Sequence, residues 1–328
     1  MGNAVAWLIS TLAAVIPTTI YVLILWWFDR YEKEPRRLLL VAFLWGAVPA
    51  IMISVLAEAA LGHPLAAVGE ATAELMSSSL LAPVVEEGIK GLAVFLLFLF
   101  FRREFDDVLD GIIYGATIGF GFAMTENAFY FMGSLASGGL QRLTLTVFFR
   151  ALVFGLNHAL FTSVFGAALG YARTVRKGYR RWVVPPLGLL GAMALHGVHN
   201  LFAVLSRITC FSLLLGLISD WSGALVIFAV MTLAWQQEKR WIAMHLKAEV
   251  ASGLITQEEY DMIGSYRRRL AAQWRARSRY GQAEARRLSK LAQLATELAF
   301  KVEQGDEHTA QKLRGEIAAL HAAQKPIL

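Results

Sequence analysis

The residues best suited to chemistry are two adjacent glutamates and a lysine, Glu86, Glu87 and Lys90, within an otherwise apolar stretch at residues 77–101. At a rise of 1.5 Å per residue this stretch is long enough to cross a bilayer. A charged side chain at that depth costs roughly 2.5–3.5 kcal/mol. Glu86 and Lys90 are spaced i, i+4 on one helix face, which predicts an ion pair, whereas Glu87 lies on another face. A structural ion pair alone leaves Glu87 unexplained, so we expect a functional site.

Further polar side chains occur in the next three apolar stretches. Residues 111–132 contain Glu126 and Asn127, residues 143–171 contain Arg150 and His158, and residues 183–205 contain His196, His199 and Asn200. Ionisable groups at membrane depth usually face the protein interior, so we expect these groups to border one cavity in the outer half to the middle of the bilayer. Arg150 either pairs with a glutamate or extends to the interface.

The combination of carboxylate, imidazole and amide groups suits hydrolysis. A carboxylate in an apolar cavity holds a proton more tightly than in water, so it can take one from a water molecule at neutral pH. Histidine and asparagine can stabilise the oxyanion of a tetrahedral intermediate. We therefore predict the catalytic residues to be Glu86, Glu87, Glu126, His158, His196 and Asn200, with Lys90, Asn127, Arg150 and His199 in supporting roles.

A covalent nucleophile and the common zinc motifs are not indicated. The sequence has no Gly-x-Ser-x-Gly motif and no His-Glu-x-x-His motif. Its single cysteine, Cys210, lies near the outer end of the last apolar stretch and excludes an intramolecular disulfide or a cysteine-rich zinc site.

The elements that position these groups are predicted to be membrane helices. The chain has 328 residues, of which 56% are hydrophobic and 17% charged, a balance typical of an all-α, polytopic membrane bundle. We expect about seven spans, at residues 4–28, 38–61, 77–101, 111–132, 143–171, 183–205 and 210–235. Lys and Arg concentrate in the odd-numbered loops, which predicts a cell-membrane protein with its N-terminus outside and its C-terminus in the cytoplasm.

Two further features concern organisation. Glycines four residues apart, at 111, 115 and 119 and at 166 and 170, predict close helix packing. Residues 236–328 lose the membrane pattern and predict a cytoplasmic helical tail, which follows a transmembrane domain at residues 1–235 that carries the predicted catalytic residues. Within the tail, Thr256 and Glu259 predict a capping box. The net charge of +6 reflects membrane orientation, so we expect a lipid environment and no nucleic-acid partner.

Four motifs in order along the chain resemble the PrsW family of bacterial intramembrane proteases. They are Glu86-Glu87-x-x-Lys90, Gly121-Phe122-x-x-x-Glu126-Asn127, His158 with Phe161-Thr162 and Gly166, and His196-x-x-x-Asn200. The loop Asp29-Arg30-Tyr31-Glu32-Lys33-Glu34-Pro35 is also similar to that family. The resemblance covers roughly residues 20–205. In the wider group, with the type II CAAX prenyl endopeptidases and the bacteriocin-processing membrane proteases, the second motif usually carries Phe-x-x-x-His, whereas this chain has Glu126-Asn127.

The resemblance implies a metalloprotease that cleaves a membrane-embedded substrate, such as an anti-sigma factor, in a bacterial stress response. The residues leave two mechanisms open. In one, Zn²⁺ is held by His158, His196 and a glutamate. In the other, Glu86 or Glu87 is the base and no cofactor takes part. We favour the second, because the first needs ligands from three spans to converge without a local pair of histidines.

Two other functions also fit intramembrane charges. A proton- or ion-coupled transporter would use a similar set of groups, but it predicts an internal repeat with broken helices in both halves. A non-catalytic membrane adaptor would act through the tail, yet it has no use for carboxylates at membrane depth. Hydrolysis explains more of the polar groups than either alternative.

Overall fold

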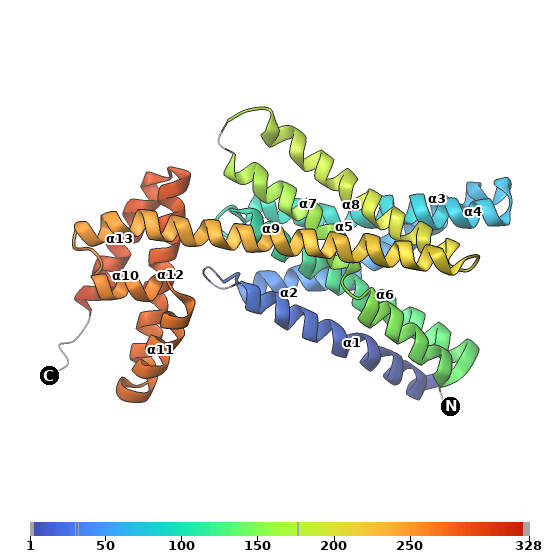
Figure 1. The fold of residues 1–328 in the computed structure, drawn as a ribbon, viewed down its shortest axis with the longest axis horizontal. Helices are drawn as coiled ribbons and strands as arrows, with labels where there is room; N and C mark the ends of the chain where they lie inside the picture. Colours follow the sequence, from blue (N-terminus) through green and yellow to red (C-terminus); the bar gives the residue numbers. More distant parts are fainter. Residues whose placement is uncertain (1–2, 30, 32, 176, 324–328) are drawn as a thin grey trace. The chain divides into compact units, whose positions relative to one another are not determined.

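The computed structural model describes residues 3–29, 31, 33–175 and 177–323, so Arg30 and Glu32 of the first loop lie outside the described residues. The described residues are helical and contain no strand, which confirms the all-α prediction. They form two compact units, one of Met1–Phe28 and Glu34–Met231, the other of Asp29–Lys33 and Thr232–Leu328. The long helix α9 (Cys210–Ala251) contributes to both (Figure 1).

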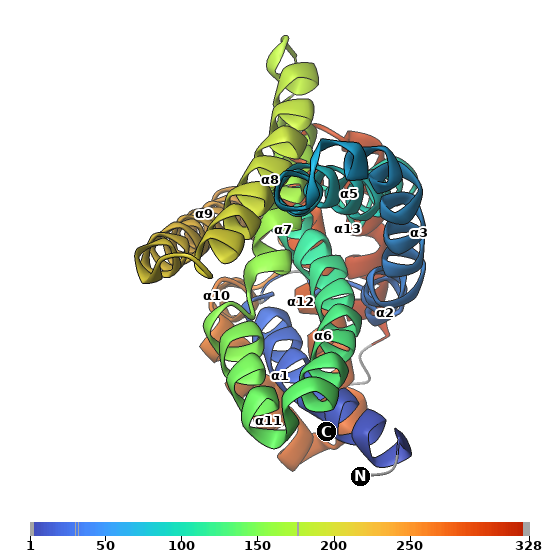
Figure 2. The same cartoon turned by 90° about the vertical axis from the view of Figure 1, so that its right-hand side faces the viewer.

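The first unit is a helical bundle. Its elements are α1 (Asn3–Phe28), α2 (Arg36–Trp45), η1 (Gly46–Ala50), α3 (Ile51–Gly62), η2 (His63–Val68), α4 (Glu70–Met76), η3 (Ser77–Leu81), α5 (Ala82–Phe100), α6 (Val108–Val147), η4 (Phe148–Val153), α7 (Asn157–Thr174), α8 (Arg180–Leu205) and the first half of α9. Helices α6 and α7 lie between α9 on one side and α2 and α3 on the other (Figure 2). Buried apolar residues of α5, α6 and α7 form a core cluster that includes Val94, Tyr114, Ile118, Phe165 and Leu169.

Five helical segments are long and apolar enough to cross a membrane. They are Ala4–Phe28, Arg36–Gly62, Val108–Thr174, Arg180–Leu205 and Cys210–Ala251. The third of these combines the two spans predicted at residues 111–132 and 143–171. Helix α5 is not among them and carries three charged residues, Glu86, Glu87 and Lys90. The chain is therefore a multi-pass membrane protein.

Glycines bring α6 and α7 into direct backbone contact. A Cβ atom on Gly111 would overlap the carbonyl group of Gly166, and one on Gly166 would overlap that of Gly111. Gly119 lies in the same way against the carbonyl group of His158. These contacts confirm the packing role predicted from the glycine spacing. They also fix the position of His158 along the axis of α6.

The helix boundaries around the site differ from the prediction. Helix α6 begins at Val108 with a capping box from Asp107 and Asp110, and it turns only at Gly139, which has a positive φ of 65°. The span predicted at residues 143–171 is not continuous, because η4 ends at Val153 and α7 begins at Asn157. Gly155 in this break packs so closely against Ala151 and Tyr21 that a Cβ would overlap them. Asn157 and His158 consequently occupy the first turn of α7.

The second unit has its own core. It contains the end of α9, α10 (Gln257–Ile263), α11 (Tyr266–Tyr280), α12 (Gln282–Gln304) and α13 (Glu307–Ala322), which pack through Leu246, Ile263, Leu291, Leu298 and Ile317. The predicted capping box at Thr256 and Glu259 is confirmed at the start of α10. Tyr31 also belongs to this unit: its backbone carbonyl accepts a hydrogen bond from Arg269 Nη1 at 3.0 Å, and its ring stacks on Trp235.

Candidate active site

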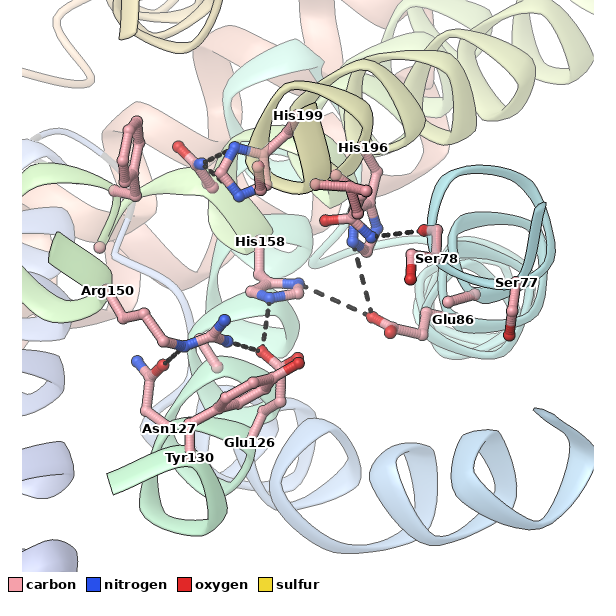
Figure 3. A pocket seen from close by; sticks show the side chains of 18 of the residues that line it. Ser77, Ser78, Glu86, Glu126, Asn127, Tyr130, Arg150, His158, His196 and His199 are labelled. Atoms are coloured by element: carbon pink, nitrogen blue, oxygen red, sulfur yellow. Dashed lines mark hydrogen bonds and ion pairs between the residues drawn. The ribbon is translucent and has the colours of Figure 1, made fainter. Parts of the chain in front are cut away.

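Many polar residues of the bundle line one cavity of about 330 Å³. Residues from α3, η3, α5, α6, η4, α7 and α8 line it, including Glu86, Glu126, His158 and His196 (Figure 3). Asn200 belongs to the same lining. Each of these residues comes from a predominantly apolar helix, so the packing of the bundle brings the polar groups together. The convergence predicted for these side chains is present.

The two adjacent glutamates have different surroundings. Glu86 lines the cavity, whereas Glu87 does not and is 1% exposed. Glu87 Oε1 lies 2.6 Å from Lys90 Nζ, and Glu87 Oε2 accepts a hydrogen bond from Thr162 Oγ1 at 2.9 Å. Glu86 Oε2 lies 3.3 Å from the same Lys90 Nζ. The expectation that Glu87 lacks Lys90 as a partner is therefore wrong, because an i, i+3 pair also shares a helix face.

Each histidine that faces Glu86 is held by another carboxylate. His158 Nε2 lies 2.9 Å from Glu126 Oε2, and its Nδ1 lies 3.9 Å from Glu86 Oε2. His196 Nδ1 lies 3.0 Å from Glu87 Oε1, and its Nε2 lies 3.9 Å from Glu86 Oε2. The two rings are 5.1 Å apart and nearly perpendicular. One nitrogen of each ring therefore carries a hydrogen bond to a carboxylate, and the other faces Glu86.

This arrangement fits a metal ion. Glu86, His158 and His196 each offer one potential ligand atom, and these three atoms lie within 4.8 Å of one another. Three protein ligands beside a cavity match the usual catalytic zinc site, which keeps a position open for water. Glu126 and Glu87 supply the outer carboxylates that normally orient metal-binding imidazoles. The objection that ligands from three spans would not converge does not hold for this bundle.

Lys90 supplies a positive charge beside these ligands. It is completely buried, and its Nζ lies 3.2 Å from His158 Nδ1 and 4.1 Å from the centre of the Phe122 ring. The lysine balances part of the charge of Glu86 and Glu87. A buried charge without such a partner would be strongly destabilising.

Arg150 pairs with Glu126, one of the glutamates in the predicted set. Arg150 Nη2 lies 2.5 Å from Glu126 Oε2, and Arg150 Nε donates to Asn127 Oδ1 at 2.8 Å. The guanidinium also lies 3.7 Å from the centre of the Tyr130 ring. Arg150 therefore holds the carboxylate that in turn holds His158.

Asn200 and His199 line the same cavity from α8. Asn200 Nδ2 donates to the backbone carbonyl of Ser78 at 2.8 Å, which fixes the amide against η3. His199 Nδ1 lies 2.7 Å from Asp220 Oδ2 in α9. Asn157 Nδ2 donates to the same oxygen at 2.9 Å.

Sequence reasoning missed two carboxylates. Asp220 and Glu58, which also lines the cavity, are not among the residues predicted from the sequence. Each is the sole charged residue of its apolar stretch, at residues 210–235 and 38–61. The cost of a lone charge at membrane depth was the signal that could have identified both.

Comparisons with known proteins give a consistent result. The family described as PrsW family intramembrane metalloprotease matches residues 34–236. Protease PrsW of Geobacillus kaustophilus (strain HTA426) is 32% identical over 174 residues, which cover 52% of this chain and 69% of that protein. Protease PrsW of Bacillus subtilis (strain 168) is 31% identical over 177 residues, or 52% of this chain and 72% of that protein. No solved structure gives a significant match.

The matched region contains every residue of the cavity described above. The matched region ends at residue 236, so most of the second unit lies outside it. The chain belongs to the PrsW family of intramembrane metalloproteases.

Proposed function

We propose that the cavity is the active site of this intramembrane endopeptidase and that it hydrolyses a peptide bond of a membrane-embedded protein with a water molecule activated at Glu86, His158 and His196. The convergence of these three side chains within 4.8 Å, on the wall of a cavity inside apolar helices, is the observation that carries the proposal. An anti-sigma factor with a single span is the first substrate to test.

Zinc is the metal that we propose for these three ligands. Two imidazole nitrogens and one carboxylate oxygen form a donor set that zinc prefers, and the outer carboxylates Glu87 and Glu126 support it. A zinc ion bound there supplies a Lewis acid that lowers the pKa of a water molecule to about 7.

The surrounding residues have supporting roles in this proposal. Glu87 orients His196, and Glu126 orients His158. Arg150 holds Glu126 in place, and Lys90 balances the charge of the paired glutamates. Asn200, fixed on the Ser78 carbonyl, keeps an amide group at the cavity wall for the substrate carbonyl. Apolar helices around the cavity limit the access of bulk water, which strengthens each of these electrostatic contacts.

The test combines cleavage and metal content. Purified protein is reconstituted in liposomes with a panel of tagged single-span membrane proteins, including anti-sigma factors, and fragments are identified by mass spectrometry. Bound metal is measured on the same preparation. We expect about one zinc ion per chain, cleavage that a zinc chelator abolishes and added zinc restores, and no cleavage by the Glu86→Gln variant.

Three results would change the proposal. Cleavage that persists without metal would leave the carboxylate and histidines as the sole catalytic groups. Unimpaired cleavage by Glu86→Gln would refute the assigned site. Proton-dependent flux in the same liposomes, with no proteolysis of any panel member, would favour a transporter.

A further inference from the structure

Asp220 is a buried carboxylate with two polar partners on other helices. It is 5% exposed and lies in a part of α9 that has no other charged residue. Its Oδ2 atom lies 2.7 Å from His199 Nδ1 in α8 and 2.9 Å from Asn157 Nδ2 in α7. A lone carboxylate at membrane depth is costly, and these partners offset that cost. Asp220 itself does not line the cavity, whereas His199 does.

The contacts of His199 favour one of its two neutral tautomers. Asn157 Nδ2 and His199 Nδ1 are 2.9 Å apart and both lie next to the one Asp220 oxygen. An ionised carboxylate only accepts hydrogen bonds, so the amide and the imidazole nitrogen are both donors. These contacts favour the neutral tautomer of His199 that is protonated on Nδ1 and has its lone pair on Nε2, which lies 3.5 Å from the same Asn157 Nδ2.

Aromatic side chains hold the same ring. The Phe154 ring lies edge-on to His199 with centroids 5.3 Å apart, and the Phe161 ring lies 6.0 Å away. Phe161 also stacks on His196, with centroids 4.9 Å apart. One phenylalanine thus packs against both His196 and His199, which fixes the second histidine beside the proposed water-activating group.

We propose that Asp220 is a positioning residue for peptide hydrolysis and that it holds His199 with Nε2 available to donate a proton to the leaving amine. The inference rests on the proposed function. In hydrolysis, the oxygen of water forms a bond to the carbonyl carbon and keeps one hydrogen, while the C–N bond breaks with its electron pair left on nitrogen. The other proton of the water passes to Nε2 of neutral His199. Nε2 then donates this proton to the leaving nitrogen, which returns His199 to its neutral form.

Kinetics of a panel substrate cleaved in liposomes test the role of Asp220. We expect Asp220→Asn to lower kcat about 10- to 100-fold, by analogy with outer carboxylates that orient metal-binding imidazoles, with KM changed less than about twofold. Asp220→Glu should recover more activity than Asp220→Ala. Ser222→Ala is the matched control, because Ser222 is an exposed residue of the same helix whose hydroxyl donates to the Ser219 carbonyl.

A double variant separates positioning from packing. If Asp220 acts through His199, Asp220→Asn should slow the His199→Gln variant by less than about twofold. A purely structural role predicts that the two losses multiply. Multiplied losses, or a wild-type kcat in Asp220→Asn, would overturn the proposal.

Nitrogen NMR of the histidine side chains provides a measurement that needs no cleavage. In protein labelled with ¹⁵N-histidine, with His199 assigned through His199→Gln, we expect the Nδ1-protonated form in the wild type and its loss in Asp220→Asn. An Nε2-protonated His199 in the wild type would refute the positioning role. Because this result does not depend on a substrate, it remains decisive if no panel member is cleaved and the proposed function itself fails.

Discussion

Replacing Glu87 by Gln separates the functions of the two adjacent glutamates. Glu87 Oε1 lies 3.0 Å from His196 Nδ1 and 2.6 Å from Lys90 Nζ, and the substitution keeps the shape of the side chain but removes its charge. A hydrogen bond to a charged group contributes about 1.5–3 kcal/mol, which is about 10- to 150-fold in an equilibrium constant. Outer carboxylates on metal-binding histidines have effects of about 10- to 100-fold.

We therefore expect Glu87→Gln to weaken zinc binding about 10- to 100-fold and to recover much of its activity at saturating zinc. Glu86→Gln removes a proposed ligand, so its activity should not return at any zinc concentration. Competition with a coloured zinc chelator measures the affinity, and cleavage of a panel substrate at several zinc concentrations measures the recovery.

The control is Glu303→Gln, which removes a carboxylate 2.7 Å from His245 Nε2 in the second unit. It should leave zinc affinity unchanged. Wild-type affinity in Glu87→Gln would refute the orienting role of Glu87. A Glu87→Gln variant as inactive as Glu86→Gln at saturating zinc would also contradict the division of roles.

Three further predictions concern the bundle. Lys90→Met should lower the free energy of unfolding by about 3–5 kcal/mol, measured by titration with denaturing detergent, because it leaves buried carboxylates unpaired; an unchanged midpoint would refute the ion pair. Gly166→Ala should lower the free energy of unfolding by at least about 1–3 kcal/mol, because the added Cβ meets the Gly111 carbonyl. Gly133→Ala is the control and should not lower it, because no atom lies within 4 Å of the added Cβ. Cys210, the sole and exposed cysteine, should react with a membrane-impermeant maleimide on intact cells; labelling only after lysis would invert the predicted orientation.

Much of the fold was predictable because membrane helices leave a strong signal. Long apolar stretches identified the helical bundle, and glycines spaced by four residues identified the α6–α7 contact. The break before Asn157 was not predicted. It depends on the close approach of Gly155 to Tyr21 of α1, a contact across 134 positions of sequence that local pattern does not reveal.

The candidate site was predictable as a set of residues but not as an arrangement. The cost of burying charge in a membrane identified Glu86, Glu87 and Glu126, and the same argument applied to every apolar stretch would have identified Glu58 and Asp220. This argument does not predict which side chains pair with one another across helices. The pairing of Arg150 with Glu126 and of His199 with Asp220 became evident only from the packed bundle.

The sequence by itself determined that the chain is a helical membrane protein with costly polar groups in its spans, because hydropathy and the price of intramembrane charge are local properties. Only the tertiary structure decided that Glu86 faces the cavity while Glu87 holds His196. The physical reason is that helical periodicity fixes the angle between neighbouring side chains, whereas the rotation of each helix within the bundle decides what those side chains face.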